Sequence, residues 1–485
     1  MIGRMKSSQL NIVIALMLAM FLGAVEGTVV TTAIPTIVKD LQGFEFISLV
    51  FSSYLLTAAI STPIYGKLSD LYGRKNVLSI GIIIFLTGSL LCGLSQSMYM
   101  LIGFRAIQGA GAGSIFTVTY TIIGDIFTLE ERPKIQGFIG TVWGIASLVG
   151  PFLGGILVEM LSWHWIFFIN IPFGILSIIL LQKNLKEKFT KTKHSIDFAG
   201  TITLSAAILI FLNIFISSEN IDINHNMFIA ISVLLTMIML AAFYKIERKA
   251  KEPVIPFDIF TKTSTIVNAI SFLAAAILIG ANVYLPIYIQ NVLGFSAKMS
   301  GLALAPMSVA WLIASVILGK CIIKYGAKTA ILISNVILLI STILMPTLGI
   351  DSSLLVLLLY VVIMGVGFGG AFTTLTIIVQ ESVEYNQRGV ATATNSLLRT
   401  LGQTIGVSVF GSIFNLYISK YFIELGIKGI DPSNLYKSSA YTVAITSEQI
   451  KLSLHYSLHA LFIILIAIAA LTLILSIAMP KIPRE

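Results

Sequence analysis

Charged residues are scarce in this sequence. Only 11% of its 485 residues are Asp, Glu, Lys or Arg, whereas 56% are hydrophobic, and the mean hydropathy is +0.95. Soluble domains carry about 25% charged residues, and a water-soluble fold could not bury this much apolar surface. The composition therefore excludes an ordinary soluble enzyme or binding domain.

Disulfide frameworks, metal-ligand clusters and nucleotide-binding motifs are also lacking. Cys92 and Cys321 stand far apart in the sequence and suggest no disulfide. No GxxxxGK[ST] loop occurs, so we expect that the chain does not hydrolyse ATP and binds no cofactor. The histidines show no metal-ligand spacing, and we expect no metal site: His164, His194, His225, His455 and His459. A membrane-embedded enzyme or channel is therefore the most remote alternative.

Long apolar runs dominate the sequence instead. There are about fourteen, each of roughly 20 residues, which is the length needed to cross about 30 Å of hydrocarbon. Most Lys and Arg residues lie in the loops on the side of the N-terminus, so the net charge of +9 reflects membrane topology rather than a nucleic-acid partner. These patterns predict an all-α protein in the lipid bilayer, with both termini cytoplasmic.

Two internal matches indicate a duplication. GKLSDLYGRK at 66–75 aligns without gaps with GKCIIKYGAK at 319–328, and GAGAG at 109–113 matches GVGFG at 365–369. Such repeats are common in transporters, and these lie in corresponding helices of two six-helix sets. The sequence separation between GAGAG and GVGFG is the same as that between Arg132 and Arg388, so these two arginines also correspond.

The repeats define a six-plus-two-plus-six organisation. We predict an N-terminal six-helix bundle at 1–190, an inserted helix pair with its linkers at 191–255, and a C-terminal six-helix bundle at 256–485. The last bundle contains a long extracellular loop at about 414–455.

Three ionisable residues fall within predicted membrane helices. A charge at the centre of such a helix costs about 2.5 to 3.5 kcal/mol on insertion scales, so each suggests a function. Glu26 and Arg105 are expected at one depth, where burial favours the protonated carboxyl and Arg105 favours the ionised one. This balance predicts a proton-coupling site; the alternative is a static structural ion pair. Arg399 has no acidic residue in its own helix, and either backbone carbonyls or polar groups such as Gln403 could accept its hydrogen bonds.

Two motifs suggest moving parts. A cytoplasmic gate is predicted after the second helix and at the end of the fourth: Gly66, Asp70, Gly73, Arg74, Lys75 and Asp125. A close-packing hinge is predicted in the fifth helix: Gly140, Gly144, Gly150, Pro151, Gly154 and Gly155. Candidate cavity-lining residues are Tyr54, Trp143, Asn282, Tyr284, Tyr288 and Arg399.

Taken together, these stretches resemble the major facilitator superfamily. The similarity rests on GKLSDLYGRK, on LIGFRAIQGAGAG with Arg105, and on GTVWGIASLVGPFLGG, which resembles the helix-five signature of antiporters. The extra central helices and VEGTVVTTAIP resemble the fourteen-helix drug:proton antiporters of bacteria. That branch usually has Asp at the position of Glu26, and Arg where this chain has His164.

The resemblance implies a bacterial cell-membrane exporter of small amphiphilic drugs, cationic or neutral, driven by exchange for protons. We expect a monomer whose halves rock around a central cavity, with Glu26 serving substrate and proton in turn. A transporter of a specific lipid, peptide or metabolite on the same scaffold is the closer alternative, since a fold does not determine its substrate.

Overall fold

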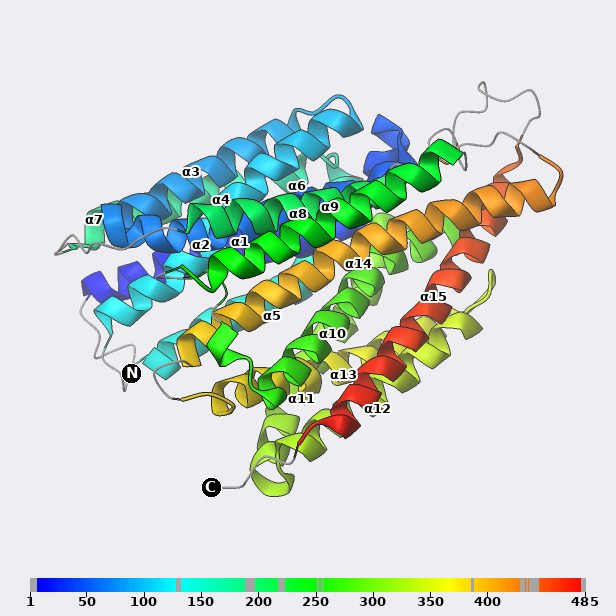
Figure 1. Cartoon of the computed structure of the whole chain (residues 1–485). Helices are drawn as coiled ribbons and strands as arrows, with labels where there is room; N and C mark the ends of the chain where they lie inside the picture. The colour runs from blue at the N-terminus through cyan, green and yellow to red at the C-terminus, as the bar shows by residue number, and fades with distance from the viewer. Residues whose placement is uncertain are drawn as a thin grey trace. The chain divides into compact units, whose positions relative to one another are not determined.

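Helices make up all the regular structure in the described part of this computed structural model. The described residues are 7–127, 132–187, 197–216, 223–250, 253, 255, 257–384, 388–427, 432, 435 and 445–480, and some side chains inside the helices are not described. Helices satisfy their own backbone hydrogen bonds, as a bilayer requires. The elements, labelled in part in Figure 1, are α1 (Ser7–Leu41), η2 (Phe44–Phe46), α2 (Ile47–Tyr72), α3 (Arg74–Gly93), α4 (Met98–Ile126), α5 (Arg132–Met160), α6 (Trp165–Phe168), α7 (Asn170–Asn184), α8 (Phe198–Ile216), α9 (Ile223–Glu247), η3 (Phe257–Ile259), α10 (Lys262–Ile287), η4 (Tyr288–Val292), α11 (Ala297–Tyr325), α12 (Ala327–Leu344), η5 (Met345–Thr347), α13 (Leu354–Glu381), α14 (Arg388–Glu424) and α15 (Ser447–Ala478).

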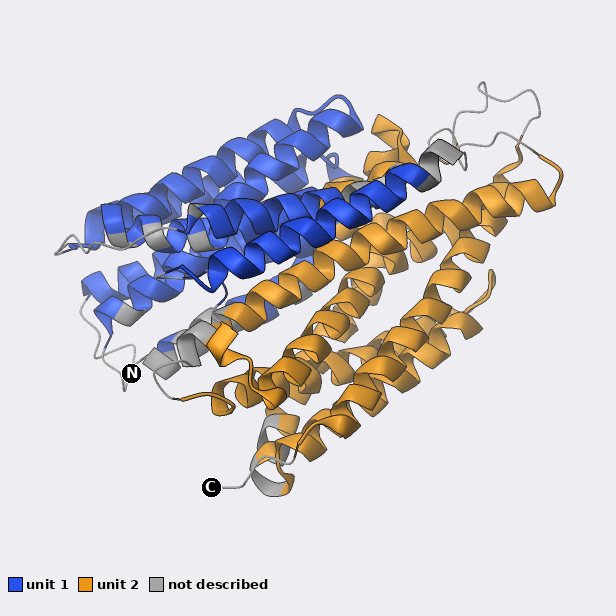
Figure 2. Cartoon of the chain, viewed as in Figure 1, with its two compact units in different colours: residues 1–30, 53–150, 160–256 blue, residues 31–52, 151–159, 257–485 orange. Residues whose placement is uncertain are grey.

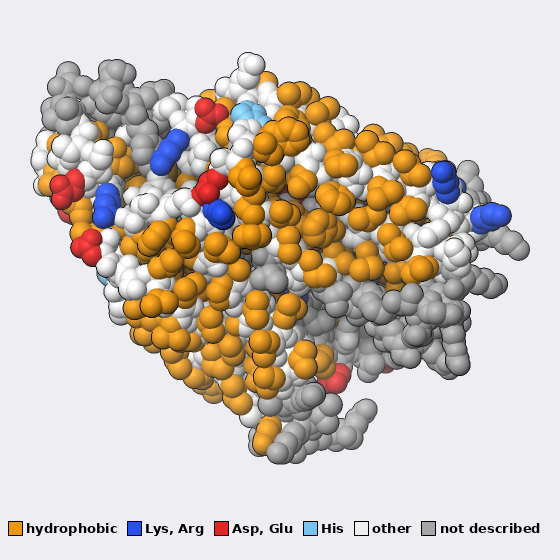
Figure 3. All heavy atoms as spheres, turned by 180° about the vertical axis from the view of Figure 1, so that it is seen from behind, with side chains coloured by type: hydrophobic (Ala, Val, Ile, Leu, Met, Phe, Trp, Pro, Cys, Tyr) orange, Lys and Arg blue, Asp and Glu red, His pale blue; other side chains and the backbone are white. Residues whose placement is uncertain are grey.

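Most of these helices suit a membrane. Within the described residues, twelve are long and apolar enough to cross one, with α6 and α7 forming a single span. The helices α4 and α8, which have 29 and 19 residues, are not among those twelve. Large hydrophobic side chains remain exposed, for example Val316 at 61% and Ile317 at 56%, and Figure 3 shows such side chains over broad parts of one face. This surface suits contact with hydrocarbon rather than water.

The chain divides into two compact units, coloured in Figure 2. Unit 1 consists of Met1–Val30, Ser53–Gly150 and Met160–Pro256, and unit 2 of Thr31–Ser52, Pro151–Glu159 and Phe257–Glu485. Four of the five boundaries fall inside α1, α2 and α5, so each of these helices contributes to both units. One of the two boundaries in α5 lies between Gly150 and Pro151 of the predicted hinge.

Each unit packs its glycine-rich helix in the same way. A Cβ atom at Gly109 of α4 would lie 2.2 Å from the carbonyl oxygen of Tyr54, and one at Gly365 of α13 would lie 2.2 Å from that of Met307. Gly109 and Gly365 are equivalent in the match of GAGAG with GVGFG. Tyr54 and Met307 are equivalent in the match of GKLSDLYGRK with GKCIIKYGAK, because they have the same separation in the sequence. The glycines therefore allow close backbone contact at equivalent places in the two repeats.

The loop expected at about 414–455 is shorter in the structure than in the prediction, because the helices on both sides of it extend beyond their apolar runs. Helix α14 continues to Glu424 and α15 begins at Ser447. A helix can extend past an apolar run because its backbone hydrogen bonds do not depend on apolar side chains. Lys420 and Glu424, both 54% exposed, lie 3.9 Å apart on this extension.

Candidate functional site

The charged centre of unit 1 is an ion pair between Glu26 of α1 and Arg105 of α4. Both side chains are only 1% exposed, and Arg105 donates from Nη1 to Oε1 of the carboxylate. The other oxygen, Oε2, accepts a hydrogen bond of 2.8 Å from Nδ2 of Asn170 in α7. Donors from two helices, α4 and α7, thus satisfy both oxygens of a fully buried carboxylate, as a buried charge requires.

A polar network surrounds this pair. Arg105 Nη1 also donates to Gln108 Oε1 at 2.7 Å, and Gln108 Nε2 donates to Ser89 Oγ at 3.2 Å. Asn170 Nδ2 donates to the same Ser89 oxygen at 3.0 Å, and Ser89 in turn donates to the Phe167 carbonyl at 2.8 Å. Side chains from α3, α4 and α7 therefore hold Glu26 and Arg105 in fixed positions.

An aromatic ring closes one side of the guanidinium. The centroid of the Tyr54 ring lies 4.2 Å from Arg105 Cζ, and Tyr54 is 3% exposed. A cation held against a ring face is stabilised without further hydrogen bonds. Arg105 therefore has an acceptor in Gln108 and an aromatic contact in Tyr54, both independent of the charge on Glu26.

This arrangement can accommodate Glu26 in two forms. Burial disfavours the ionised carboxyl, whereas Arg105 and Asn170 favour it. The arrangement offers a single buried carboxylate to a proton or another cation.

The sequence interpretation did not include Gln108, Asn170 or Ser89. Gln108 follows Arg105 by one helical turn, so a search for polar residues on the same face of α4 would have found it. Asn170 and Ser89 are polar residues in apolar runs, but their partners are distant in sequence. Only the packing of α3 and α7 on the other helices brings them together.

Some residues of the predicted gate lie together in unit 1. Arg74 and Asp125 form an ion pair, with side chains 28% and 40% exposed. Glu187, which the sequence interpretation missed, accepts from the backbone N–H groups of Arg74 and Lys75 at 2.9 and 3.2 Å. It caps the N-terminus of α3, where an acidic group is favourable. Gly73 has φ of +88° at this turn, which explains why the position is a glycine.

The remaining gate residues differ in what they contact. Lys75 Nζ donates to the Gln182 carbonyl at the end of α7, at 2.8 Å. Gly66 lies in α2, where an added Cβ would be 3.5 Å from Thr117, an ordinary contact. The side chain of Asp70 lies outside the described residues.

The Gly–Pro motif of α5 contacts different helices on either side of residue 150. In unit 1, a Cβ at Gly150 would lie 1.9 Å from Thr28 Oγ1 of α1. In unit 2, one at Gly301 of α11 would lie 2.0 Å from the Pro151 carbonyl oxygen, and one at Gly155 would lie 2.5 Å from Cα of Lys298. Gly144 and Gly154 are buried, whereas Gly140 is not among the residues described in detail. The motif therefore packs closely on other helices at Gly150, Pro151 and Gly155.

The candidate cavity-lining residues have very different environments. Trp143 is 44% exposed and stacks on Phe116, with ring centroids 5.5 Å apart. Asn282 is half-buried. Tyr284 and Tyr288 are 1% and 0% exposed, and the Tyr288 hydroxyl donates to the Gly349 carbonyl at 2.6 Å. The two tyrosines pack inside unit 2, whereas Trp143 has surface available for a ligand.

One expectation about histidine needs correction. His455 and His459 do have a spacing found in metal sites, since they lie one turn apart on α15 with ring centroids separated by 6.3 Å. Among the residues that the structure describes, however, no group of three or more His, Cys, Asp or Glu could hold a metal ion.

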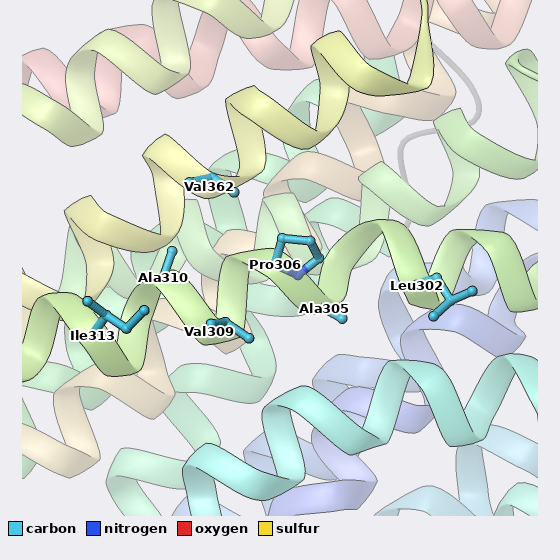
Figure 4. Close-up of a pocket in the computed structure, with 7 residues that line it drawn as sticks. All are labelled: Leu302, Ala305, Pro306, Val309, Ala310, Ile313 and Val362. Carbon is cyan, nitrogen blue, oxygen red and sulfur yellow. The ribbon is translucent and has the colours of Figure 1, made fainter.

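An apolar recess of about 410 Å³ lies on α11 and α13 in unit 2 (Figure 4). Its lining contains no polar side chain: Leu302, Ala305, Pro306, Val309, Ala310, Ile313 and Val362. Such a surface suits hydrocarbon and offers nothing to orient a polar ligand.

Comparison with known proteins agrees with this architecture. The model of the Major Facilitator Superfamily matches residues 16–407. Multidrug resistance protein 3 of Bacillus subtilis is 37% identical over 412 residues, covering 84% of this chain and 80% of that protein. The multidrug efflux pump SdrM of Staphylococcus aureus is 34% identical over 90% of this chain and 95% of its own length.

Solved structures share the fold at low sequence identity. A bacterial homologue of the human lysosomal transporter Spinster, in an inward-facing and unoccupied conformation, has a TM-score of 0.70 at 15% identity, with 98% of each chain covered. The xylose transporter XylE from E. coli has a TM-score of 0.62 at 14% identity, covering 99% of this chain and 100% of XylE. The chain therefore belongs to the major facilitator superfamily and is a multi-pass membrane transporter rather than an enzyme.

Proposed function

We propose that this chain is a proton-coupled antiporter that exports small amphiphilic drugs, cationic or neutral, by alternating access. The observation that carries the proposal is the buried Glu26, whose two oxygens are held by Arg105 and Asn170. A membrane-embedded carboxylate with a neighbouring guanidinium is suited to proton exchange. The names of the relatives, a multidrug resistance protein and a multidrug efflux pump, support drugs as the substrates.

The proposal extends to the surroundings of the protein. We place the chain in the bacterial cell membrane as a monomer with fourteen spans, counting α4 and α8, and with both termini in the cytoplasm. The positive-inside distribution of Lys and Arg supports this orientation. The proton gradient alone drives export, without a cofactor.

The coupling follows from competition for one group. A cationic drug leaving from Glu26 and a proton arriving there exchange one charge for one charge, so their exchange is electroneutral. Export of a neutral drug against one proton moves a net charge and also draws on the membrane potential, worth about 2.3 kcal/mol per 100 mV. The dependence on potential should therefore differ between cationic and neutral substrates.

The decisive experiment measures proton-driven transport of a fluorescent cation into inverted membrane vesicles. We expect Glu26→Gln to lose the component that depends on the proton gradient, and Glu26→Asp to retain it, because Asp keeps the titratable carboxyl. Glu424→Gln, at a position 54% exposed, is the matched control and should behave as wild type. Undiminished gradient-driven transport by Glu26→Gln would refute the proposal.

A transporter of a lipid, peptide or specific metabolite is the alternative. A panel of structurally unrelated drugs separates the two functions, because an exporter of amphiphiles lowers susceptibility to several of them when it is expressed in a sensitive strain. Protection against none would favour the specific transporter.

A further inference from the structure

Arg399 is a guanidinium in a membrane-spanning helix, and its hydrogen-bond partners within the described residues are all neutral. Its Nη2 donates to Thr376 Oγ1 at 2.8 Å and to the Phe372 carbonyl at 3.3 Å. Its Nε is buried without an acceptor, and Nη1 donates no hydrogen bond within the described part of the chain. No carboxylate among the described residues pairs with it. An unpaired charge at membrane depth is costly, so retaining one suggests that it binds something.

Flat aromatic rings lie beside this group. The centroid of Phe372 is 4.8 Å from Arg399 Cζ, and the Trp311 ring stacks on Phe372 at 5.3 Å with an interplanar angle of 10°. Phe368 stacks with both of them, at 6.0 Å from Phe372 and 5.6 Å from Trp311. We call Trp311, Phe368 and Phe372 the aromatic cluster of unit 2. Phe368 and Phe372 are buried, at 0% and 8% exposed, whereas Trp311 is half-buried, so Trp311 is the ring of the cluster that a ligand can reach. A cation beside such a ring favours ligands that combine negative charge with an aromatic plane.

The first repeat has a different residue at the equivalent place. The offset that relates GAGAG to GVGFG, and Arg132 to Arg388, also relates Phe116 to Phe372 and Trp143 to Arg399. In unit 1 the pair is a Trp143–Phe116 stack, and in unit 2 it is a guanidinium against Phe372. Because the contact geometry recurs while the chemistry changes, the second repeat has an anion-attracting group where the first has a neutral ring.

We propose that Arg399 and the aromatic cluster of unit 2 form a subsite for the carboxylate of a flat aromatic amphiphile. The Nη1 group, which has no acceptor within the described residues, supplies a donor for a carboxylate, and guanidinium binds carboxylates with charge-assisted hydrogen bonds. The substrates then include aromatic zwitterions as well as the cationic and neutral compounds above. This inference rests on the proposed function, since it names a substrate class for the same exporter.

The test uses two dyes that differ only in the carboxyl group. Rhodamine 19 carries a free carboxylate, and rhodamine 6G is its ethyl ester. We expect Arg399→Gln to raise the Kd of the purified protein for rhodamine 19 roughly tenfold or more, as for a lost charge-assisted hydrogen bond, and that for rhodamine 6G less than about twofold. Arg399→Lys, which keeps the charge without the planar donors, should fall between wild type and Arg399→Gln.

The outcomes separate a binding role from a structural one. An equal loss of affinity for both dyes would mean that Arg399 only supports the fold. Unchanged affinity for rhodamine 19 in Arg399→Gln, or no binding of rhodamine 19 by the wild type, would equally overturn the proposal. Binding is measured without a proton gradient, whereas uptake of rhodamine 6G by inverted vesicles, with and without the gradient, tests the exporter itself. Failure of one proposal is therefore distinguishable from failure of the other.

Discussion

The two repeats differ in the partners that they provide for a buried arginine. In unit 1 the buried guanidinium of Arg105 has a carboxylate partner, whereas in the described part of unit 2 the partners of Arg399 are neutral. The offset between Pro35 of α1 and Pro286 of α10 places Ile277, which is fully buried, opposite Glu26. The second repeat therefore lacks the carboxylate on which the first is centred.

The backbone contacts, by contrast, are shared. Glycines of α4 and α13 approach the same carbonyl positions of α2 and α11 in both repeats. Close helix packing constrains those positions sterically, so a side chain there would disrupt the bundle. Polar side chains can change without disturbing the packing, so one scaffold has room for the proposed proton site in one half and the proposed ligand subsite in the other.

The largest expected difference between the two units is in the stability lost when Arg105 or Arg399 is replaced. We expect Arg105→Gln to lower the stability by about 3–5 kcal/mol, because it leaves the Glu26 carboxylate buried without its partner. Arg399→Gln strands no such charge and should cost less than about 1 kcal/mol. Thermal unfolding of both variants in detergent measures the difference.

A double variant supplies the control for Arg105. Glu26→Gln combined with Arg105→Gln removes both charges and should recover most of the lost stability while gradient-driven transport remains absent. If Arg105→Gln proved no less stable than Arg399→Gln, the paired charge would not distinguish the two units.

A serine and a glycine in the helix pairs α3–α4 and α12–α13 allow a second test. A Cβ at Gly81 would lie 2.2 Å from that of Ser114, and in unit 2 one at Gly370 would lie 2.3 Å from Ser334 Oγ, so the two residues have exchanged helices. We expect Gly81→Ser to cost about 1–3 kcal/mol through overpacking.

The exchange seen in unit 2 should rescue that variant. Ser114 donates to the Val77 carbonyl, and Ser334 to the equivalent carbonyl of Ala330, at 3.2 and 2.8 Å. Gly81→Ser combined with Ser114→Gly should therefore keep the hydrogen bond and unfold close to the wild-type temperature. Additive losses in the double variant would show that the two repeats pack differently here.

Much of this comparison could be predicted from the sequence. Apolar runs indicated the helices, and the GAGAG and GVGFG match indicated the repeat, because close packing restricts the residue type at each contact. A charge in an apolar run is equally conspicuous, which is why Glu26 and Arg105 could be named.

Partners distant in sequence could not be predicted. Asn170 reaches Glu26, and Glu187 caps α3, only through tertiary packing that no local pattern specifies. The burial of Tyr284 and Tyr288 had the same cause, since aromatic residues in a membrane helix can face a cavity or a neighbouring helix, and sequence spacing does not distinguish the two.

The cap at the start of α3 is a smaller difference between the repeats, and we expect its removal to have a smaller effect on stability. Glu187 accepts two backbone N–H groups there, whereas no side chain within the described residues accepts from the equivalent N–H groups of Ala327 and Lys328 in α12. We expect Glu187→Ala to cost about 0.5–2 kcal/mol, as for other helix caps. Glu384→Ala, at an exposed position in unit 2, is the control for loss of a carboxylate. Equal melting temperatures for the two variants would contradict a capping role.

The smallest expected effect concerns the lysine that both repeats retain. Lys75 donates to the Gln182 carbonyl near the end of α7, and Lys328, at the equivalent position, donates to the Ile477 carbonyl at 2.8 Å near the end of α15. Cations at helix C-termini contribute about 0.3–1 kcal/mol, so Lys75→Met and Lys328→Met should lower the unfolding temperature by similar small amounts. Matched losses would mean that this lysine holds the last helix of each repeat in place. A loss confined to Lys75→Met would instead assign the lysine to the Arg74–Asp125 cluster, which has no counterpart at Ala327 in unit 2.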